Sequence, residues 1–408
     1  MVNDKTKKII LLMTVIVIAI MAYLVHSPKF RHYYKGTQPK LVELKNRAIA
    51  AKGIKIKSEK RAKSVQPALP EITIQKVKIG ISLPLTGEGA IIGNAVKQSL
   101  EMAQSETPQD TKYKYEIIFN DSNGLGKSIE ENTAGLITSD KVDVMLSLMN
   151  KDAEIVGRMT DGYQIPHITC AYGREAVKEY KYTFNHFPTP ETKAKSFIKN
   201  LEDNNIKIFS IVAQDVPYIN EILDAVENEA RENNYPIYNK VMVKKGTSDF
   251  SKEVDSLVAK MPEAVMVMLE PDEMEFFAEQ LDNAAEDVFV YTSIDLLHNF
   301  YNKKLVDGAI YIIASDGDFR FKTDFRKRSV LQVPLCAVNL YDAYKMIVQA
   351  YEKSAGSVKP KSDVIYEEIY TISDFPSASG ADIKVSLDRT IDSPMIGVKI
   401  EKGFLKYE

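Results

Sequence analysis

The chain has 408 residues, of which 45% are apolar and 27% are charged. This length suffices for two or three domains, and the composition is typical of a protein with a sizeable core. It excludes a largely disordered chain, a polytopic membrane protein and a collagen-like repeat. The chain has only two cysteines, Cys170 and Cys336, which excludes a disulfide framework and a four-cysteine zinc site.

Charge is distributed unevenly along the chain. The formal net charge is −3, but residues 1–26 carry +2, residues 27–70 carry +10 and the remainder carries −15. The acidic remainder argues against nucleic-acid binding by that part of the chain.

An apolar segment near the N-terminus predicts a membrane anchor. Ile9–Val25 contains 17 residues without a charge, which is the lower limit for crossing a bilayer, and Lys5, Lys7 and Lys8 precede it. A cleaved signal peptide is the alternative, but no small-x-small site and no lipoprotein cysteine follow. We interpret residues 9–26 as an uncleaved transmembrane signal anchor, with residues 1–8 in the cytoplasm.

Residues 27–70 are rich in lysine and arginine and contain no apolar run that could build a core. We interpret them as a basic, solvated stalk. The alternative is a polybasic contact with anionic lipid headgroups, worth about 1 kcal/mol per basic residue near the surface. Because Lys29, Arg31 and Lys35 closely follow the anchor, the positive-inside rule does not decide its orientation.

The remaining sequence alternates between strand and helix patterns. Val77–Leu83 alternates apolar and small or polar residues before Pro84, and apolar residues then recur at helical spacing over 92–103. Further strands are predicted at Tyr115–Phe119, Val142–Leu146, Ile208–Ala213, Ile237–Val243, Ala264–Met268 and Val288–Tyr291. This alternation predicts parallel sheets with helices on both faces, and the length predicts two such lobes.

Two glycine-containing turns resemble phosphate-binding loops but lack the required spacing. Gly87–Gly93 follows the first strand with the spacing GxGxxxG instead of GxGxxG. The stretch 126–128, GKS, lacks the glycine of a P-loop six residues before its lysine. We interpret the first turn as close helix packing. No cofactor is predicted.

Catalytic and metal-binding patterns are equally weak. The sequence contains no GxSxG or HExxH motif, and its five histidines lack metal-ligand spacing. Cys170 and His167 could form a nucleophile pair, but a packed strand end explains them better. We predict that the protein is not an enzyme.

Seven short motifs occur in the order found in one family. They are KIGISLPLTG (78–87), NDS (120–122), QIPHIT (164–169), DVPY (215–218), GTSDF (246–250), LYDA (340–343) and GVKIEKG (397–403). Together they resemble type I periplasmic solute-binding proteins, and more closely the leucine/isoleucine/valine-binding protein family of ABC transporters. The resemblance covers about residues 76–406.

The resemblance implies an α/β fold of two doubly wound lobes joined by three crossings. Lobe 1 would comprise residues 76–187 and 316–388, and lobe 2 residues 188–315 and 389–408. A ligand would bind between the lobes and favour a closed form.

In this family a helix N-terminus and hydroxyl groups hold the carboxylate of an amino acid. The corresponding stretch here is Asn150, Lys151 and Asp152, where the family's glycine and serines are missing. These residues are either an altered ligand contact or a plain helix cap. The next implied contact is Cys170–Ala171–Tyr172. In lobe 2 the implied contacts are Tyr218, Glu270 and Asp295, the last as the partner of an amine.

Two functions follow from this resemblance. The first is a membrane-tethered, extracytoplasmic binding protein for an amino acid or similar small polar ligand, serving transport or sensing. The second is a ligand-free scaffold that binds a cell-envelope protein, similar to the penicillin-binding-protein activators. Both place the protein in a bacterial inner membrane, with a single span and the C-terminal body in the periplasm. We also predict that Cys170 and Cys336 are buried, unpaired thiols.

Overall fold

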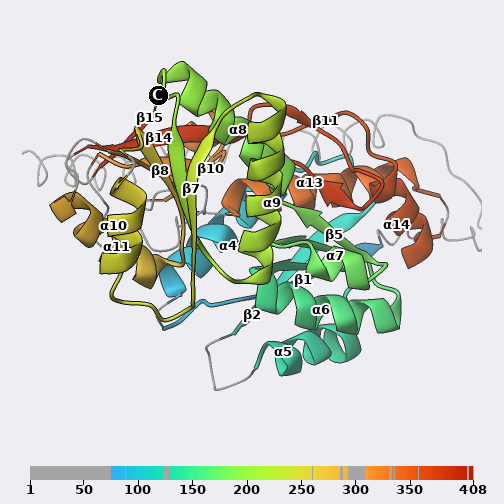
Figure 1. Ribbon diagram of the computed structural model, residues 1–408. Helices are drawn as coiled ribbons and strands as arrows, with labels where there is room; N and C mark the ends of the chain where they lie inside the picture. Colours follow the sequence, from blue (N-terminus) through green and yellow to red (C-terminus); the bar gives the residue numbers. More distant parts are fainter. Residues whose placement is uncertain are drawn as a thin grey trace, which may run out of the picture. The chain divides into compact units, whose positions relative to one another are not determined.

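Alternating strands and helices build two separate sheets (Figure 1). The computed structural model describes residues 75–407 except 88, 123–127, 260, 285–287, 293–307, 330–332, 335, 357 and 402–403. The predicted anchor and stalk lie outside these residues. Within the described part, no helix combines the length and the apolar character needed to span a membrane.

The first sheet has six parallel strands in the order β13-β5-β4-β3-β1-β2 and defines lobe 1. Its strands are β1 (Lys76–Leu83), β2 (Lys114–Asp121), β3 (Val144–Leu148), β4 (His167–Cys170), β5 (Thr183–His186) and β13 (Thr390–Ile391). β3 and β4 are buried along their whole length, as expected of central strands covered on both faces.

The second sheet has seven strands in the order β15-β14-β10-β9-β8-β6-β7 and defines lobe 2. Its strands are β6 (Phe209–Gln214), β7 (Ile237–Val243), β8 (Ala264–Met268), β9 (Phe289–Thr292), β10 (Ile310–Ala314), β14 (Met395–Glu401) and β15 (Phe404–Tyr407). β6 to β10 are parallel, whereas β14 and β15 are antiparallel. A small two-stranded sheet pairs β11 (Phe375–Pro376) with β12 (Asp382–Ile383).

Helices pack against both sheets. Those associated with lobe 1 are α4 (Ala90–Ser105), α5 (Ile129–Gly135) with the π-helical turn η2 (Leu136–Asp140), α6 (Asn150–Tyr163), α7 (Glu175–Glu179), α12 (Phe319–Arg328), α13 (Ala337–Lys353) and α14 (Ser362–Tyr370). Those associated with lobe 2 are α8 (Pro190–Asp203), α9 (Pro217–Glu232), α10 (Ser251–Val258) and α11 (Pro271–Ala284).

The chain passes between the two sheets three times, after β5, after β10 and after β13. The third passage follows Ile391, because β13 pairs with β5 in the first sheet. This is slightly later than the boundary predicted at residue 388. The strands predicted from the sequence are confirmed, with shifts of one or two residues at their ends.

The turn after β1 illustrates how the sequence positions a helix. Asp121, at the end of β2, accepts hydrogen bonds from the backbone N–H of Leu85 at 3.0 Å and from Oγ1 of Thr86 at 2.7 Å. A Cβ atom on Gly93 would lie 2.1 Å from the carbonyl oxygen of Pro84. This close approach requires glycine and supports the packing interpretation of the Gly87–Gly93 turn.

Candidate functional site

The turn between β3 and α6 has an unusual backbone. Met149 lies at φ 70° and ψ 152°, a region that only glycine enters without strain. Its N–H donates to the carbonyl of Cys170 at 2.8 Å, and its carbonyl accepts from the N–H of Ala153 at 3.0 Å. The turn therefore holds a conformation suited to glycine, although the sequence places methionine there.

Asn150 is the first residue of α6 and links the turn between β3 and α6 to the loop that follows β4. Its Oδ1 atom accepts hydrogen bonds from the backbone N–H groups of Tyr172 at 2.8 Å and Gly173 at 3.2 Å. These N–H groups belong to the loop that the resemblance implied as a ligand contact. The two donors are therefore already satisfied by the protein itself. The adjacent Lys151 is exposed.

Asp152 lines a cavity of about 270 Å³ at the carboxyl ends of β1, β2 and β3, which we call the lobe 1 pocket. The lining residues are mainly apolar: Pro84, Gly89, Ile92, Ser122, Ile129, Leu148, Met149 and Asp152. Burial raises the pKa of Asp152 to about 7, opposed by the nearby charge of Lys151. The carboxyl group therefore titrates near neutral pH.

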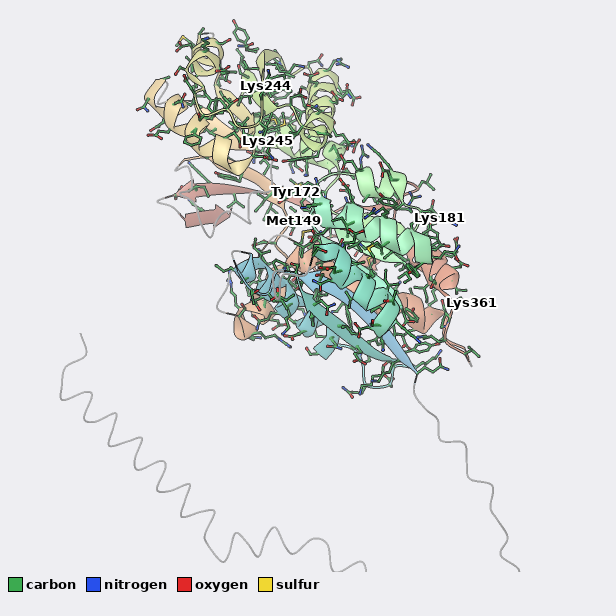
Figure 2. All side chains as sticks on the ribbon, turned by 90° about the horizontal axis from the view of Figure 1, so that it is seen from below. Met149, Tyr172, Lys181, Lys244, Lys245 and Lys361 are labelled. Carbon is green, nitrogen blue, oxygen red and sulfur yellow. A yellow bond between two sulfur atoms is a disulfide. The ribbon has the colours of Figure 1, made fainter. Side chains whose placement is uncertain are left out.

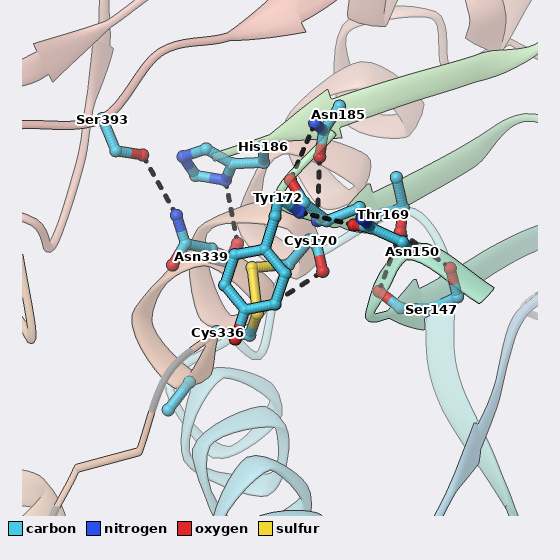
Figure 3. Close-up of a disulfide and its surroundings, with 12 residues drawn as sticks. Ser147, Asn150, Thr169, Cys170, Tyr172, Asn185, His186, Cys336, Asn339 and Ser393 are labelled. Carbon is cyan, nitrogen blue, oxygen red and sulfur yellow. Dashed lines mark hydrogen bonds between the residues drawn. A yellow bond between two sulfur atoms is a disulfide. The ribbon is translucent and has the colours of Figure 1, made fainter. Parts of the chain in front are cut away.

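The loop after β4 is fixed from two sides. Asn185 accepts from the N–H of Ala171 at 3.0 Å and donates through Nδ2 to the carbonyls of Ala171 at 3.0 Å and Gly173 at 3.1 Å. On the other side, Cys170 forms a disulfide with Cys336 (Figure 3). Tyr172 therefore projects from a rigid loop.

The disulfide shows that the prediction of two unpaired thiols is wrong. Cys170 ends β4, Cys336 is the N-cap of α13, and their Cα atoms are 5.8 Å apart. The sequence separation of 166 residues concealed this contact, because it arises only when α13 packs against β4. It also removes the thiol from the Cys170–His167 pair. His167 is buried and instead contacts the hydroxyls of Ser147 at 2.8 Å and Thr183 at 3.1 Å.

Lobe 2 contributes an aromatic residue to the junction between the lobes. Tyr218, in the first turn of α9, stacks on Tyr172 with 6.0 Å between ring centroids and 26° between ring planes. Burial, followed by the charge and hydrogen bond of Glu270, raises the pKa of Tyr218. In Figure 2, Lys244 and Lys245 mark lobe 2, and Lys181 and Lys361 mark lobe 1. Met149 and Tyr172 lie between these two sets of labels.

Two carboxylates accompany Tyr218 in lobe 2. Glu270 forms an ion pair with Lys245 at 2.6 Å, and its N–H donates to Oε1 of Gln214 at 3.0 Å. Glu273 is buried and accepts from the N–H of Gly246 at 2.7 Å and from Nε2 of Gln214 at 3.2 Å. The strand ends of lobe 2 therefore present acidic groups beside Tyr218.

Lys193 is a site residue that the sequence reasoning missed. It lies in the first turns of α8 and is buried, with its ammonium 4.6 Å from the ring centroid of Phe187 and 5.8 Å from that of Tyr172. Such contacts are attractive because the aromatic face carries partial negative charge. The feature of the sequence that could have identified it is its position, because this lysine lies on the apolar stripe of α8 with Ala194, Phe197 and Ile198.

A charged group also joins the lobes. Arg174 and Lys178, from lobe 1, both contact the carboxylate of Glu221 in α9; the Arg174 contact measures 3.5 Å.

Of the predicted site residues, Asn150, Tyr172, Tyr218 and Glu270 form a chain of direct contacts, and Asp152 lies in the adjoining pocket. Asp295 lies outside the described residues.

Two α/β lobes, three passages between them and strand-end turns that meet at the junction define a two-lobed binding protein. The sequence profile of the family described as periplasmic binding protein matches residues 76–404. The chain therefore belongs to the periplasmic binding protein family, as the type I resemblance implied.

Solved structures share this fold at low sequence identity. Leucine-binding protein LivK from Thermotoga maritima is 16% identical, with 81% of this chain and 97% of that chain covered and a TM-score of 0.67. LivJ from Streptococcus pneumoniae, a branched-chain amino acid transporter protein solved with isoleucine, is 15% identical, with 81% and 98% covered and a TM-score of 0.66.

A third structure with this fold was solved with a different ligand. The solute-binding protein of an ABC transporter from Rhodopseudomonas palustris BisB5, in complex with 3,4-dihydroxybenzoic acid, is 18% identical, with 81% and 95% covered and a TM-score of 0.64. Identities this low establish the shared fold alone. No curated protein sequence matches the chain significantly.

Proposed function

We propose that this protein is an extracytoplasmic solute-binding protein that holds a small ligand between its two lobes and serves transport or sensing. The observation that carries the proposal is the Tyr172–Tyr218 pair, since it joins the lobes and Tyr172 contacts Asn150, whose chain neighbours Met149 and Asp152 line the lobe 1 pocket. Lobe 1 would contribute Met149, Asp152 and Tyr172. Lobe 2 would contribute Tyr218 and Glu270, together with Asp295 as a further contact.

The proposed location is a bacterial periplasm, with the chain tethered to the inner membrane by residues 9–26. Family membership supports an extracytoplasmic location. The Cys170–Cys336 disulfide also supports it, because disulfides persist mainly in oxidising compartments. The tether itself rests on the uncharged sequence Ile9–Val25.

The test is a thermal-shift screen of the full chain in detergent against amino acids, small amines and aromatic acids. A ligand at 100 times its Kd should add about 2.7 kcal/mol to the free energy of unfolding. Tyr218→Ala should weaken the response, because it removes half of the interlobe aromatic pair. Tyr163→Ala, at a position 58% exposed at the end of α6, is the matched control and should not.

A ligand-free scaffold that binds an envelope protein is the second candidate, and two observations favour it. Asn150 already satisfies the N–H groups of Tyr172 and Gly173, and Glu221 already joins the lobes through Arg174. If no solute in the screen stabilises the chain at millimolar concentration, the solute-binding proposal fails and the scaffold takes its place.

A further inference from the structure

The lobe 1 pocket combines apolar walls with one carboxyl group. Its volume of about 270 Å³ exceeds the roughly 150 Å³ of an engineered apolar cavity that binds benzene. Asp152 and Ser122 are the polar members of its described lining. The remaining lining suits a small branched or aliphatic group, whereas the carboxyl group suits a donor of hydrogen bonds or a cation.

The charged groups around Asp152 offset little of the cost of burying its negative charge. Lys151, on the same helix, is exposed and is the single charge that lowers the Asp152 pKa among the described residues. Several of the other charged groups on the elements packed around α6 bond elsewhere: Asp121 to Leu85 and Thr86, Glu131 to Ser128, Glu130 to Arg158, Glu179 to Tyr180, and Arg174 and Lys178 to Glu221.

The same place is unfavourable for binding a ligand carboxylate. The N–H groups of Tyr172 and Gly173 donate to Asn150, so they are not available to an anion. An anion near the N-terminus of α6 would also face the carboxyl group of Asp152. Across the junction, Glu270 and Glu273 add two more acidic groups, of which Glu270 is paired with Lys245.

We propose that this site selects a small organic amine whose aliphatic body fills the lobe 1 pocket and whose ammonium group pairs with Asp152, in preference to an α-amino acid. This inference rests on the proposed solute-binding function and specifies its ligand class. It reverses the expectation drawn from the family resemblance, in which the helix N-terminus holds a carboxylate. The change follows from two residues, because Asn150 occupies the N–H donors of Tyr172 and Gly173 beside the helix N-terminus and Asp152 places a carboxyl group in its first turn.

The test compares three probes with the same branched body: 3-methylbutylamine, 4-methylpentanoic acid and leucine, which carry the amine, the acid and both groups. Each is titrated calorimetrically into the full chain in detergent at pH 8, with a reference titration into detergent alone. The amine should bind at least tenfold more tightly than leucine, and the acid should bind most weakly. Asp152→Asn should weaken amine binding at least 30-fold, because it leaves a desolvated ammonium unpaired.

The control variant is Glu154→Gln, which neutralises an exposed carboxylate on the same helix and should leave amine binding unchanged. A second readout is the dependence on pH. Amine binding should weaken on the order of tenfold from pH 8 to pH 6, because Asp152 becomes protonated, and this dependence should vanish in Asp152→Asn.

Tighter binding of leucine or of the acid than of the amine would overturn the inference, as would an Asp152→Asn variant that binds the amine normally. If none of the three probes binds while the broad screen finds another ligand, the amine inference falls and the solute-binding function stands. If neither experiment finds a ligand, both fall.

Discussion

Oδ1 of Asn150 accepts a hydrogen bond from the backbone N–H of Tyr172 at 2.8 Å, which ties the first residue of α6 to the loop that follows β4. The same oxygen accepts from Gly173 at 3.2 Å. A side-chain carbonyl therefore occupies two donors that a ligand carboxylate would otherwise use. This relationship underlies our proposal that the ligand chemistry differs from that which the family resemblance implied.

Asn150→Ser should open the site to carboxylates. The shorter side chain frees the N–H groups of Tyr172 and Gly173, so 4-methylpentanoate should bind at least tenfold more tightly than it binds the wild type. Without a ligand, the variant should lose about 1–3 kcal/mol of unfolding free energy through the unsatisfied donors. Calorimetry and denaturant unfolding measure the two effects.

The matched control is Asn228→Ser, at an exposed position of α9, which should change neither quantity. Combining Asn150→Ser with Asp152→Asn should raise carboxylate affinity further, because the competing negative charge is removed. Unchanged carboxylate affinity in both variants would show that the Asn150 contacts do not govern ligand choice.

The disulfide should contribute strongly to the stability of lobe 1. Replacing both Cys170 and Cys336 with serine should lower the unfolding free energy by about 2–5 kcal/mol, since the bridge closes a loop of 166 residues. Reducing the wild-type protein should give a similar loss, measured by urea unfolding with and without reductant. The double variant is the control for the reductant itself and should not respond to it. Equal stability of oxidised and reduced wild type would contradict this.

Much of the fold was predictable because strands and helices leave local patterns. The alternation from Val77 to Leu83 and the apolar stripe Ile219, Ile222, Leu223 and Val226 correspond to β1 and α9. Short motifs in a fixed order then indicated the two-lobed arrangement. The third passage was harder to place, because β13 contains only Thr390 and Ile391.

The site was predictable only in part. Tyr172 and Tyr218 were predicted as ligand contacts from the family resemblance, and their rings stack on one another in the structure. The Asn150 contacts and the Cys170–Cys336 bridge were not foreseen, since each depends on how distant segments pack. Lys193 was missed because its place on the apolar stripe of α8 is a weak signal, and its contacts with Phe187 and Tyr172 depend on how distant segments pack.

Acid should destabilise the protein through His167. Burial lowers the pKa of His167 to about 3, against an ordinary value of 6.5 in the unfolded chain. The contribution of neutral His167 to the free energy of unfolding is therefore fully present above pH 6.5. It is lost as the pH falls, by about 1.4 kcal/mol per pH unit. Between pH 6 and pH 4.5, His167→Gln should show a shallower loss of unfolding free energy than the wild type.

His186 provides an internal comparison, because burial lowers its pKa to about 4. His186→Gln should flatten the same curve down to about pH 4, and the double variant should remove both contributions. Wild-type and variant curves that run parallel across this range would contradict the assignment.

The N-terminal segment should keep the protein in the membrane. Because Ile9–Val25 is uncharged and no cleavage site follows it, the full chain should remain in the membrane fraction after high-salt and carbonate washes. Replacing Val15, Val17 and Ile18 with lysines should release it. A soluble mature protein that begins near residue 27 would instead identify a cleaved signal peptide.

Hydrogen–deuterium exchange of the full chain, with and without the ligand found by the screen, tests most directly whether a solute sits between the lobes. Solute binding at the junction should slow exchange in both lobes, at residues 149–153 and 171–174 of lobe 1 and at residues 218–220 and 268–270 of lobe 2. Protection confined to one lobe, or protection far from Tyr172 and Tyr218, would contradict the account.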